Sequence, residues 1–214
     1  GYHPGTVLID EPMVFELPHN KKWEPANYND EYMGPVVLKS ALTKSLNIIS
    51  AKLIFKVKPA EVVKVAKKFG FTSSLRNNFS LALGATGASP LELASAYSTI
   101  ANLGVYKNPF YVSKIEDYQG NVLYEHFIEG EKRFEPEAVY PLLDMMKGVM
   151  DDGSGRVIRR MGFKHPAAGK TGTTNAFRDA WFTGFTKDLT TSVWVGYDDN
   201  GSMYRPHEKG VTGA

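Results

Sequence analysis

The sequence contains no cysteine, which excludes both a disulfide framework and a thiolate metal site. It also lacks any run of about 18 apolar residues, the minimum for a membrane-crossing helix. We therefore expect membrane attachment only through an anchor in a parent protein. The 25 basic and 23 acidic residues nearly cancel, so nothing in the charge favours binding to nucleic acid or an anionic membrane surface. The five histidines show no metal-ligand spacing, and we expect no metal and no cofactor.

The chain is long enough to bury a real core, with 214 residues of which 43% are hydrophobic. Its length fits one domain, over residues 1–214. The first 34 residues are rich in proline, asparagine and glycine, and predict an extended surface segment with little regular structure. No internal repeat and no low-complexity segment occurs.

Helical patterns dominate the middle of the chain. From Pro35 the apolar residues recur at helical spacing, with an interruption at Ser45-Leu46-Asn47. Ser89, followed by proline and then a glutamate three residues after the serine, predicts a capping box. Asp151-Asp152-Gly153-Ser154-Gly155 ends the last helical pattern. The other predicted helices cover residues 59–69, closed by Gly70, residues 90–103 and residues 137–150.

Strand patterns follow in the last third. Residues 167–173, 180–186 and 190–197 are rich in aromatic and β-branched side chains and are separated by short polar links. An additional hairpin is predicted from residues 111–118 and 121–126, which flank Gln119-Gly120. Helices followed by clustered strands predict an α+β fold, in which helices flank an antiparallel sheet.

The first of these strands carries Lys170-Thr171-Gly172-Thr173-Thr174. Strand alternation sends Lys170 and Gly172 to one face, and Thr171 and Thr173 to the other. A glycine here would let a ligand approach the backbone, while the ammonium and hydroxyl groups could hold a carboxylate. A short motif of this kind also fits an ordinary threonine-rich strand with one exposed lysine.

Gly169-Lys170-Thr171 could also end a phosphate-binding P-loop. That loop requires a glycine five positions before Gly169, where this chain has Lys164, and a helix immediately afterwards, where this chain predicts another strand. The P-loop interpretation is therefore rejected. An α/β-hydrolase is also disfavoured, because no serine lies in a Gly-x-Ser-x-Gly elbow.

Ser45-Leu46-Asn47 lies between two apolar helical stretches, beside Lys44. A serine and an asparagine two residues apart in a turn can point into one cleft. The same residues also serve ordinary helix caps and turns.

Taken together and in this order, Ser45-x-Asn47 and Lys170-Thr171-Gly172 resemble the active-site motifs of the serine penicillin-recognising family, which also carries Ser-x-x-Lys. The resemblance extends over nearly the whole chain and favours the class A, bifunctional branch of penicillin-binding proteins. It implies a transpeptidase fold with an antiparallel sheet flanked by helices. The segments that carry the class A resemblance are residues 1–6, 83–94, 168–175, 177–182 and 193–199.

The resemblance implies a role for each matched residue. Ser45 and Lys170 would be catalytic, with Ser45 relaying protons and Lys170 supplying positive potential and moving protons. Asn47 would hydrogen-bond the amide of the substrate. Thr171 and Thr173 would hold the carboxylate of a D-Ala-D-Ala stem peptide or a β-lactam.

The remaining implied roles concern the backbone and the end of the strand. Gly172 belongs to the substrate-binding strand, the backbone N–H of Thr173 would donate into the oxyanion hole, and Thr174 is a further candidate for the carboxylate.

The chain departs from the family at one decisive point. No lysine has a serine or threonine three residues before it, so the Ser-x-x-Lys motif that supplies the nucleophile is absent. We therefore expect a partial domain, with the nucleophile helix and first strands upstream and a closing helix after Gly210–Ala214. The chain alone is expected to be inactive, and a missing segment or another chain would cover its exposed strand edges and apolar surface.

The function expected of the parent is peptidoglycan cross-linking by a D,D-transpeptidase that β-lactams inhibit, on the extracytoplasmic face of the bacterial membrane. Two alternatives stay open. One is a D,D-carboxypeptidase or β-lactamase on the same scaffold, and the other is a non-catalytic pseudoenzyme that binds β-lactams or peptidoglycan.

Overall fold

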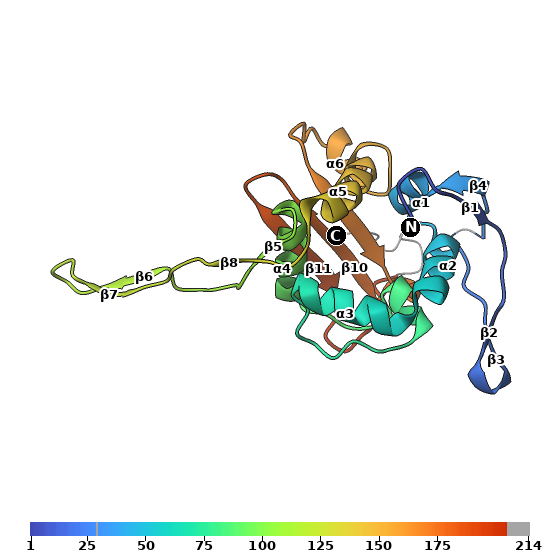
Figure 1. Ribbon diagram of the computed structural model, residues 1–214, viewed down its shortest axis with the longest axis horizontal. Helices are drawn as coiled ribbons and strands as arrows, with labels where there is room; N and C mark the ends of the chain where they lie inside the picture. The colour runs from blue at the N-terminus through green and yellow to red at the C-terminus, as the bar shows by residue number, and fades with distance from the viewer. Residues whose placement is uncertain (29, 205–214) are drawn as a thin grey trace.

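A three-stranded antiparallel sheet with helices on one face forms the centre of the molecule (Figure 1). The computed structural model describes residues 1–28 and 30–204, so the expectation for residues 210–214 lies outside the described part. The strand order is β11-β10-β9, and helices α4 and α5 pack on the sheet. This arrangement confirms the predicted α+β fold. The strands are β9 (Ala168–Thr173), β10 (Asp179–Phe185) and β11 (Thr190–Gly196).

The predicted helices are confirmed, most of them to within two residues. Ser89 accepts the backbone N–H of Glu92 at 3.2 Å, and the carboxylate of Glu92 accepts the N–H of Ser89 at 2.9 Å, which completes the capping box. Gly70 ends its helix in the left-handed conformation. The helices are α1 (Leu38–Lys44), α2 (Asn47–Val57), α3 (Pro59–Phe69), α4 (Pro90–Ala101), α5 (Pro136–Asp151) and α6 (Val157–Arg160), with 3-10 turns η1 (Pro18–Asn20), η2 (Phe79–Leu83) and η3 (Asn175–Phe177).

The main core joins the helices to the start of the sheet. Its members are apolar side chains that are buried between α4, α5, β9 and β10, and their burial supplies most of the stabilisation at this junction. They are Ile100, Val139, Met146, Ala168 and Phe185.

Helix α1 lies against α5 at very close range. Thr43 is buried at this contact, and a Cβ added at Gly148 would come 2.5 Å from its hydroxyl oxygen. Gly153 faces the carbonyl of Thr43 in the same way. Only glycine fits at these two positions, and the close contact fixes α1 relative to the sheet that α5 supports.

Two expectations for the N-terminal part are wrong. Residues 35–37 do not begin a helix, because they belong to strand β4, which pairs antiparallel with β1 in the register Leu8↔Val36. The first 34 residues also carry more regular structure than expected. The strands here are β1 (Val7–Asp10), β2 (Phe15–Leu17), β3 (Lys21–Trp23) and β4 (Gly34–Val37).

Two buried side chains hold this N-terminal part to the body. Phe15 is 3% exposed and packs against Phe55 of α2. Asp10 is fully buried, and its two carboxylate oxygens accept hydrogen bonds from the Asn27 amide at 3.0 Å each. A buried carboxylate is tolerated because it is hydrogen-bonded in this way. The segment is therefore part of the folded body.

The predicted hairpin is confirmed as a ribbon that projects far from the body (Figure 1). Its strands β6 (Lys114–Glu116) and β7 (Val122–Glu125) pair with each other, and β5 (Val105–Lys107) pairs with β8 (Gly130–Lys132) at its base. Every residue of β6 and β7 is exposed. None of the helices within residues 1–28 and 30–204 is long and apolar enough to cross a membrane.

Candidate active site

Ser45 occupies the junction between α1 and α2 and is exposed. Its backbone is left-handed, with φ 60° and ψ 47°, where it ends α1. The backbone N–H groups of Ser45 and Leu46 donate to the Leu42 and Ala41 carbonyls at 3.1 and 3.0 Å. This conformation costs a residue with a side chain about 1–2 kcal/mol relative to a right-handed helix. Such strain is often found at functional sites.

Lys170 reaches from β9 to that junction. Its Nζ donates to Ser45 Oγ at 2.7 Å and to the Thr171 carbonyl at 3.0 Å. Burial of the ammonium, which removes it from water, lowers the pKa of Lys170 to about 8. The structure thus brings together two predicted residues that are 125 positions apart in the chain.

Asn47 is the first residue of α2, and its side-chain amide is hydrogen-bonded to the N-terminal segment. Its Nδ2 donates to the Ala26 carbonyl at 2.8 Å. The two residues that follow Asn47 and Ala26 form a second hydrogen bond, in which the Ile48 N–H donates to Asn27 Oδ1 at 3.2 Å. The buried Asp10 in turn holds Asn27. The N-terminal segment therefore sets the position of Asn47, a long-range contact that no local sequence pattern predicted.

Gly172 lets β9 approach β10 closely. A Cβ at Gly172 would lie 3.2 Å from the Cβ of its partner Trp181, tighter than most real contacts. Thr173 is exposed and lies opposite Ala180 in the register. Strand β9 is an edge of the three-stranded sheet within the described part of the chain, which suits the pairing of an extended peptide.

Thr174 is engaged in the turn that follows β9. Its hydroxyl donates to Asp179 Oδ2 at 3.0 Å and accepts the Asp179 N–H at 2.8 Å. Trp194 Nε1 donates to the other carboxylate oxygen of Asp179 at 2.9 Å. Thr174 thus shapes the end of the strand, and its hydroxyl proton points to Asp179 in this structure.

Ser154, which the sequence pattern placed only in a helix break, is a neighbour of the site. Its Oγ lies 2.6 Å from Thr171 Oγ1, and its N–H donates to the Thr43 carbonyl at 3.2 Å. The only sequence signal for this residue is a serine between two glycines, Gly153 and Gly155. The partner of that hydroxyl could not be read from the sequence, because the pairing spans 17 residues.

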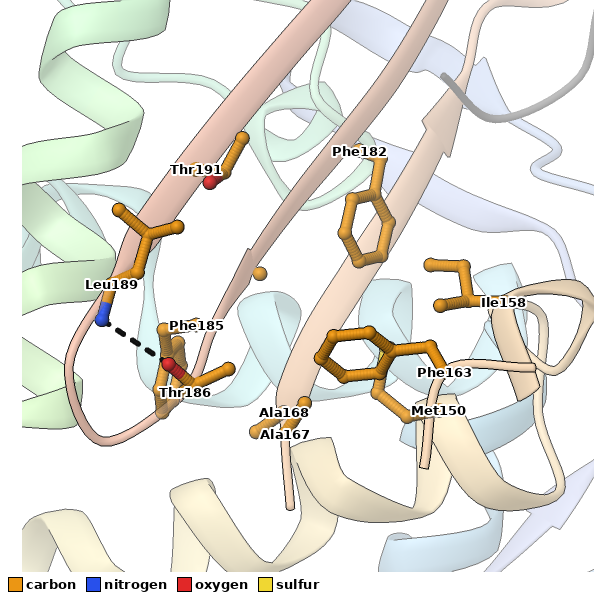
Figure 2. Close-up of a pocket in the computed structure, with 11 residues that line it drawn as sticks. Met150, Ile158, Phe163, Ala167, Ala168, Phe182, Phe185, Thr186, Leu189 and Thr191 are labelled. Carbon is orange, nitrogen blue, oxygen red and sulfur yellow. Dashed lines mark hydrogen bonds between the residues drawn. The ribbon is translucent and has the colours of Figure 1, made fainter. Parts of the chain in front are cut away.

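A separate apolar pocket lies beside β9 and β10 (Figure 2). Side chains from α5, α6 and the loop after it form one wall, with Phe163 and Phe182 drawn close to Ile158 in the view. The polar side chains in its lining are Thr186, whose hydroxyl accepts the Leu189 N–H at 3.2 Å, and Thr191. The lining includes none of the predicted site residues, so this pocket is separate from the predicted site.

The site contains cationic, hydroxyl and amide groups. No group of three His, Asp or Glu side chains that could hold a metal ion occurs in the part of the chain that the structure describes. The arrangement can move a proton between Ser45 and Lys170 and can hold an anion beside the hydroxyl groups of β9.

Comparisons with known proteins agree with this geometry. The transpeptidase domain of penicillin-binding proteins matches residues 4–207. Penicillin-binding protein 1A of Aquifex aeolicus is 42% identical over 199 residues, which cover 92% of this chain and 27% of that protein. The chain thus spans little more than a quarter of that relative.

Solved structures give the same result. Penicillin-binding protein 1A of Haemophilus influenzae superposes with a TM-score of 0.91 at 27% identity, over 98% of this chain and 37% of that one. The PonA1 protein of Mycobacterium tuberculosis in complex with penicillin V has a TM-score of 0.76 at 26% identity, over 94% of this chain and 56% of that one. With a match over nearly all of its length, the chain belongs to the transpeptidase domain family of penicillin-binding proteins.

Proposed function

We propose that this chain forms part of the D,D-transpeptidase domain of a class A penicillin-binding protein that cross-links peptidoglycan. The observation that carries the proposal is the 2.7 Å hydrogen bond from Lys170 Nζ to Ser45 Oγ, which joins the two motifs in one site. The match to penicillin-binding protein 1A relatives supports the class A assignment. The penicillin V complex of the mycobacterial relative supports β-lactams as inhibitors.

The proposed reaction is acyl transfer from a stem peptide that ends in D-Ala-D-Ala. A serine hydroxyl attacks the carbonyl of the penultimate D-Ala, the C–N bond breaks, and the terminal D-Ala leaves. The proton lost by the serine passes through Ser45 to the departing nitrogen. An acceptor amine then attacks the ester carbonyl, the ester C–O bond breaks as the new amide forms, and the proton lost by the amine returns to the serine oxygen.

Lys170 and Ser45 are suited to this proton transfer. A lysine whose pKa is about 8 is only moderately basic, so it can give up a proton near neutral pH and take one back. The hydrogen bond to Ser45 Oγ provides the path. The positive charge that remains for most of the time attracts the substrate carboxylate.

The recognition roles follow from position. Asn47, held by Ala26, would hydrogen-bond the substrate amide. The hydroxyl groups of Thr171 and Thr173 would hold the terminal carboxylate, with Thr174 as a weaker candidate because its hydroxyl bonds Asp179. Gly172 would leave room for the peptide against β9, and the N–H of Thr173 would stabilise the oxyanion, a contribution of roughly 3 kcal/mol.

The nucleophilic serine of this proposal lies outside these 214 residues, because no Ser-x-x-Lys occurs in the sequence. Without a nucleophile a serine enzyme retains only about 10³–10⁴ over the uncatalysed rate. The 214-residue chain alone is therefore proposed to be inactive. The full protein would work on the extracytoplasmic face of the membrane, held there by its own anchor.

The test uses intact-mass spectrometry after incubation with penicillin. We expect a covalent adduct on the full-length protein and no adduct on the 214-residue chain. Ser45→Ala and Lys170→Ala in the full-length protein should slow adduct formation at least about 100-fold, as expected for lost acid–base catalysis. Lys187→Ala, which removes a strongly exposed lysine, is the matched control.

Two outcomes would contradict the proposal. An adduct on the 214-residue chain would mean that a residue within it is the nucleophile, and the assigned roles would be wrong. Normal adduct formation in Lys170→Ala would show that this lysine does not take part in catalysis.

Analysis of the products from a D-Ala-D-Ala peptide, with and without an acceptor amine, would distinguish transpeptidation from hydrolysis.

A further inference from the structure

Ser154 connects the two halves of the site. It lies in the loop between α5 and α6, and its backbone N–H donates to the carbonyl of Thr43, two residues before Ser45. Its side chain lies 2.6 Å from the hydroxyl of Thr171 on β9. Ser154 thus contacts both β9, the strand that carries Lys170, and α1, the helix that is capped by Ser45.

The loop is held in this place by close packing. Gly153 and Gly155 on either side of Ser154 are buried, and a Cβ at Gly155 would lie 3.1 Å from the Val149 carbonyl. The Gly155 N–H donates to that carbonyl at 2.9 Å. The backbone of Ser154 is therefore fixed. The loop holds the Ser154 side chain beside the Thr171 hydroxyl.

The number of protons on the two hydroxyl groups decides which of them donates the hydrogen bond. Each hydroxyl has one proton to donate, and either oxygen can be the donor in the 2.6 Å hydrogen bond. A carboxylate only accepts, so a Thr171 hydroxyl that binds a carboxylate must donate its single proton to it. Ser154 must then be the donor to Thr171. Such a chain of hydrogen bonds strengthens the last donor.

We propose that Ser154 is a positioning residue that orients the Thr171 hydroxyl as a donor to the terminal carboxylate of the substrate or β-lactam. The inference deepens the proposed function and rests on it. Ser154 thereby contributes to specificity for ligands with a free carboxylate. If Ser154 is replaced by alanine, the Thr171 hydroxyl loses the donor that orients it and that strengthens its own hydrogen bond to the carboxylate. The hydroxyl is then free to rotate.

Ser154 is exposed, whereas the packing at this loop is made by its glycine neighbours and Thr43. Removal of its hydroxyl therefore leaves the packing of α1 on α5 intact. This separates the positioning role from a role in folding. It also predicts that Ser154→Thr, which keeps a hydroxyl on the same Cβ, keeps the function.

The experiment compares two probes on the full-length protein, a penicillin with its free carboxylate and the methyl ester of the same penicillin. For Ser154→Ala we expect the second-order rate of adduct formation with the free acid to fall about tenfold, the equivalent of roughly 1.4 kcal/mol. With the methyl ester, the rate should differ from that of the wild type by less than about twofold, because the anionic acceptor is gone. Ser154→Thr should restore the rate with the acid, and Ser74→Ala, at an exposed serine in another part of the fold, is the matched control.

Three results would overturn the inference. An unchanged rate with the acid in Ser154→Ala would show that the hydroxyl does not serve carboxylate binding. An equal loss with acid and ester would show a general structural effect. Absence of any adduct on the wild-type protein would instead overturn the proposed function, and the inference with it.

Discussion

Two residues of the site are held in states that disfavour folding. Ser45 has a left-handed backbone, and Lys170 is an ammonium group removed from water. Each feature opposes stability by itself, by about 1–2 kcal/mol for the backbone of Ser45. They persist because α1 is fixed against α5 and Lys170 is fixed on β9, so that the surrounding structure determines both. This combination is typical of a site that is shaped for chemistry and not for stability.

The buried charge of Lys170 makes a prediction about pH. Its pKa is lowered from an ordinary value of 10.5 to about 8, so the unfolded chain binds more protons than the folded chain between these two values. The penalty is fully present below pH 8 and is relieved as the pH rises to 10.5. In Lys170→Met, the penalty is absent at every pH. The free energy of unfolding of the wild type should therefore rise by on the order of 3 kcal/mol relative to the variant across this window.

Urea denaturation of both proteins at a series of pH values measures this difference. Lys187→Met, at the exposed lysine of the turn between β10 and β11, controls for the removal of a lysine charge as such. A difference between wild type and Lys170→Met that stays constant from pH 7 to pH 10.5 would mean that Lys170 is solvated in solution.

At the scale of the elements, the sequence predicted those parts of the fold that local signals determine. The capping box at Ser89 and the left-handed Gly70 are such signals, and their helices are confirmed. The expectation of a helix at residues 35–37 was wrong because these residues pair with β1, which lies 26 to 30 residues earlier in the chain, and helical periodicity cannot report a pairing of that kind. The contact of Ser154 with Thr171 was missed for the same reason.

The ribbon of β6 and β7 is predicted to be independent of the body in energetic terms. Tyr111 is 88% exposed and Tyr118 is 94% exposed, so neither contributes buried area. Replacing residues 108–129 by an Asn-Gly turn between β5 and β8 should leave the free energy of unfolding within about 1 kcal/mol of its original value. Thermal unfolding followed by circular dichroism measures the effect.

The β2–β3 hairpin is the contrasting control for the ribbon. Phe15 of β2 is 3% exposed and packs against Phe55, so Phe15→Ala should destabilise the chain by about 3–5 kcal/mol. A comparable loss on removal of the ribbon would show that the ribbon packs against the body in solution.

At the scale of the whole molecule, the two faces of the sheet differ. Helices α4 and α5 pack on one face, where Phe185 and Ala168 join the core. Along β11 the side chains alternate, and Val193 and Val195 are 39% and 41% exposed on the other face. Phe182, which lines the apolar pocket (Figure 2), is the partner of Val193 in the register of β10 and β11. An apolar sheet surface of this kind favours association with other apolar surfaces.

This asymmetry predicts that the 214-residue chain associates with itself through the sheet. The double substitution Val193→Thr and Val195→Thr keeps β-branched side chains on the strand and makes the exposed face polar. We expect it to reduce self-association and dye binding to apolar surface, while the melting temperature changes by less than about 3 °C. Sedimentation velocity over a range of concentrations measures the association. The matched control is Val149→Thr, which places the same hydroxyl at a side chain with no exposed surface in α5 and should lower the melting temperature instead. If the double variant associates as strongly as the wild type, the association, or its cause, lies on another surface, of which the projecting ribbon is the first to test.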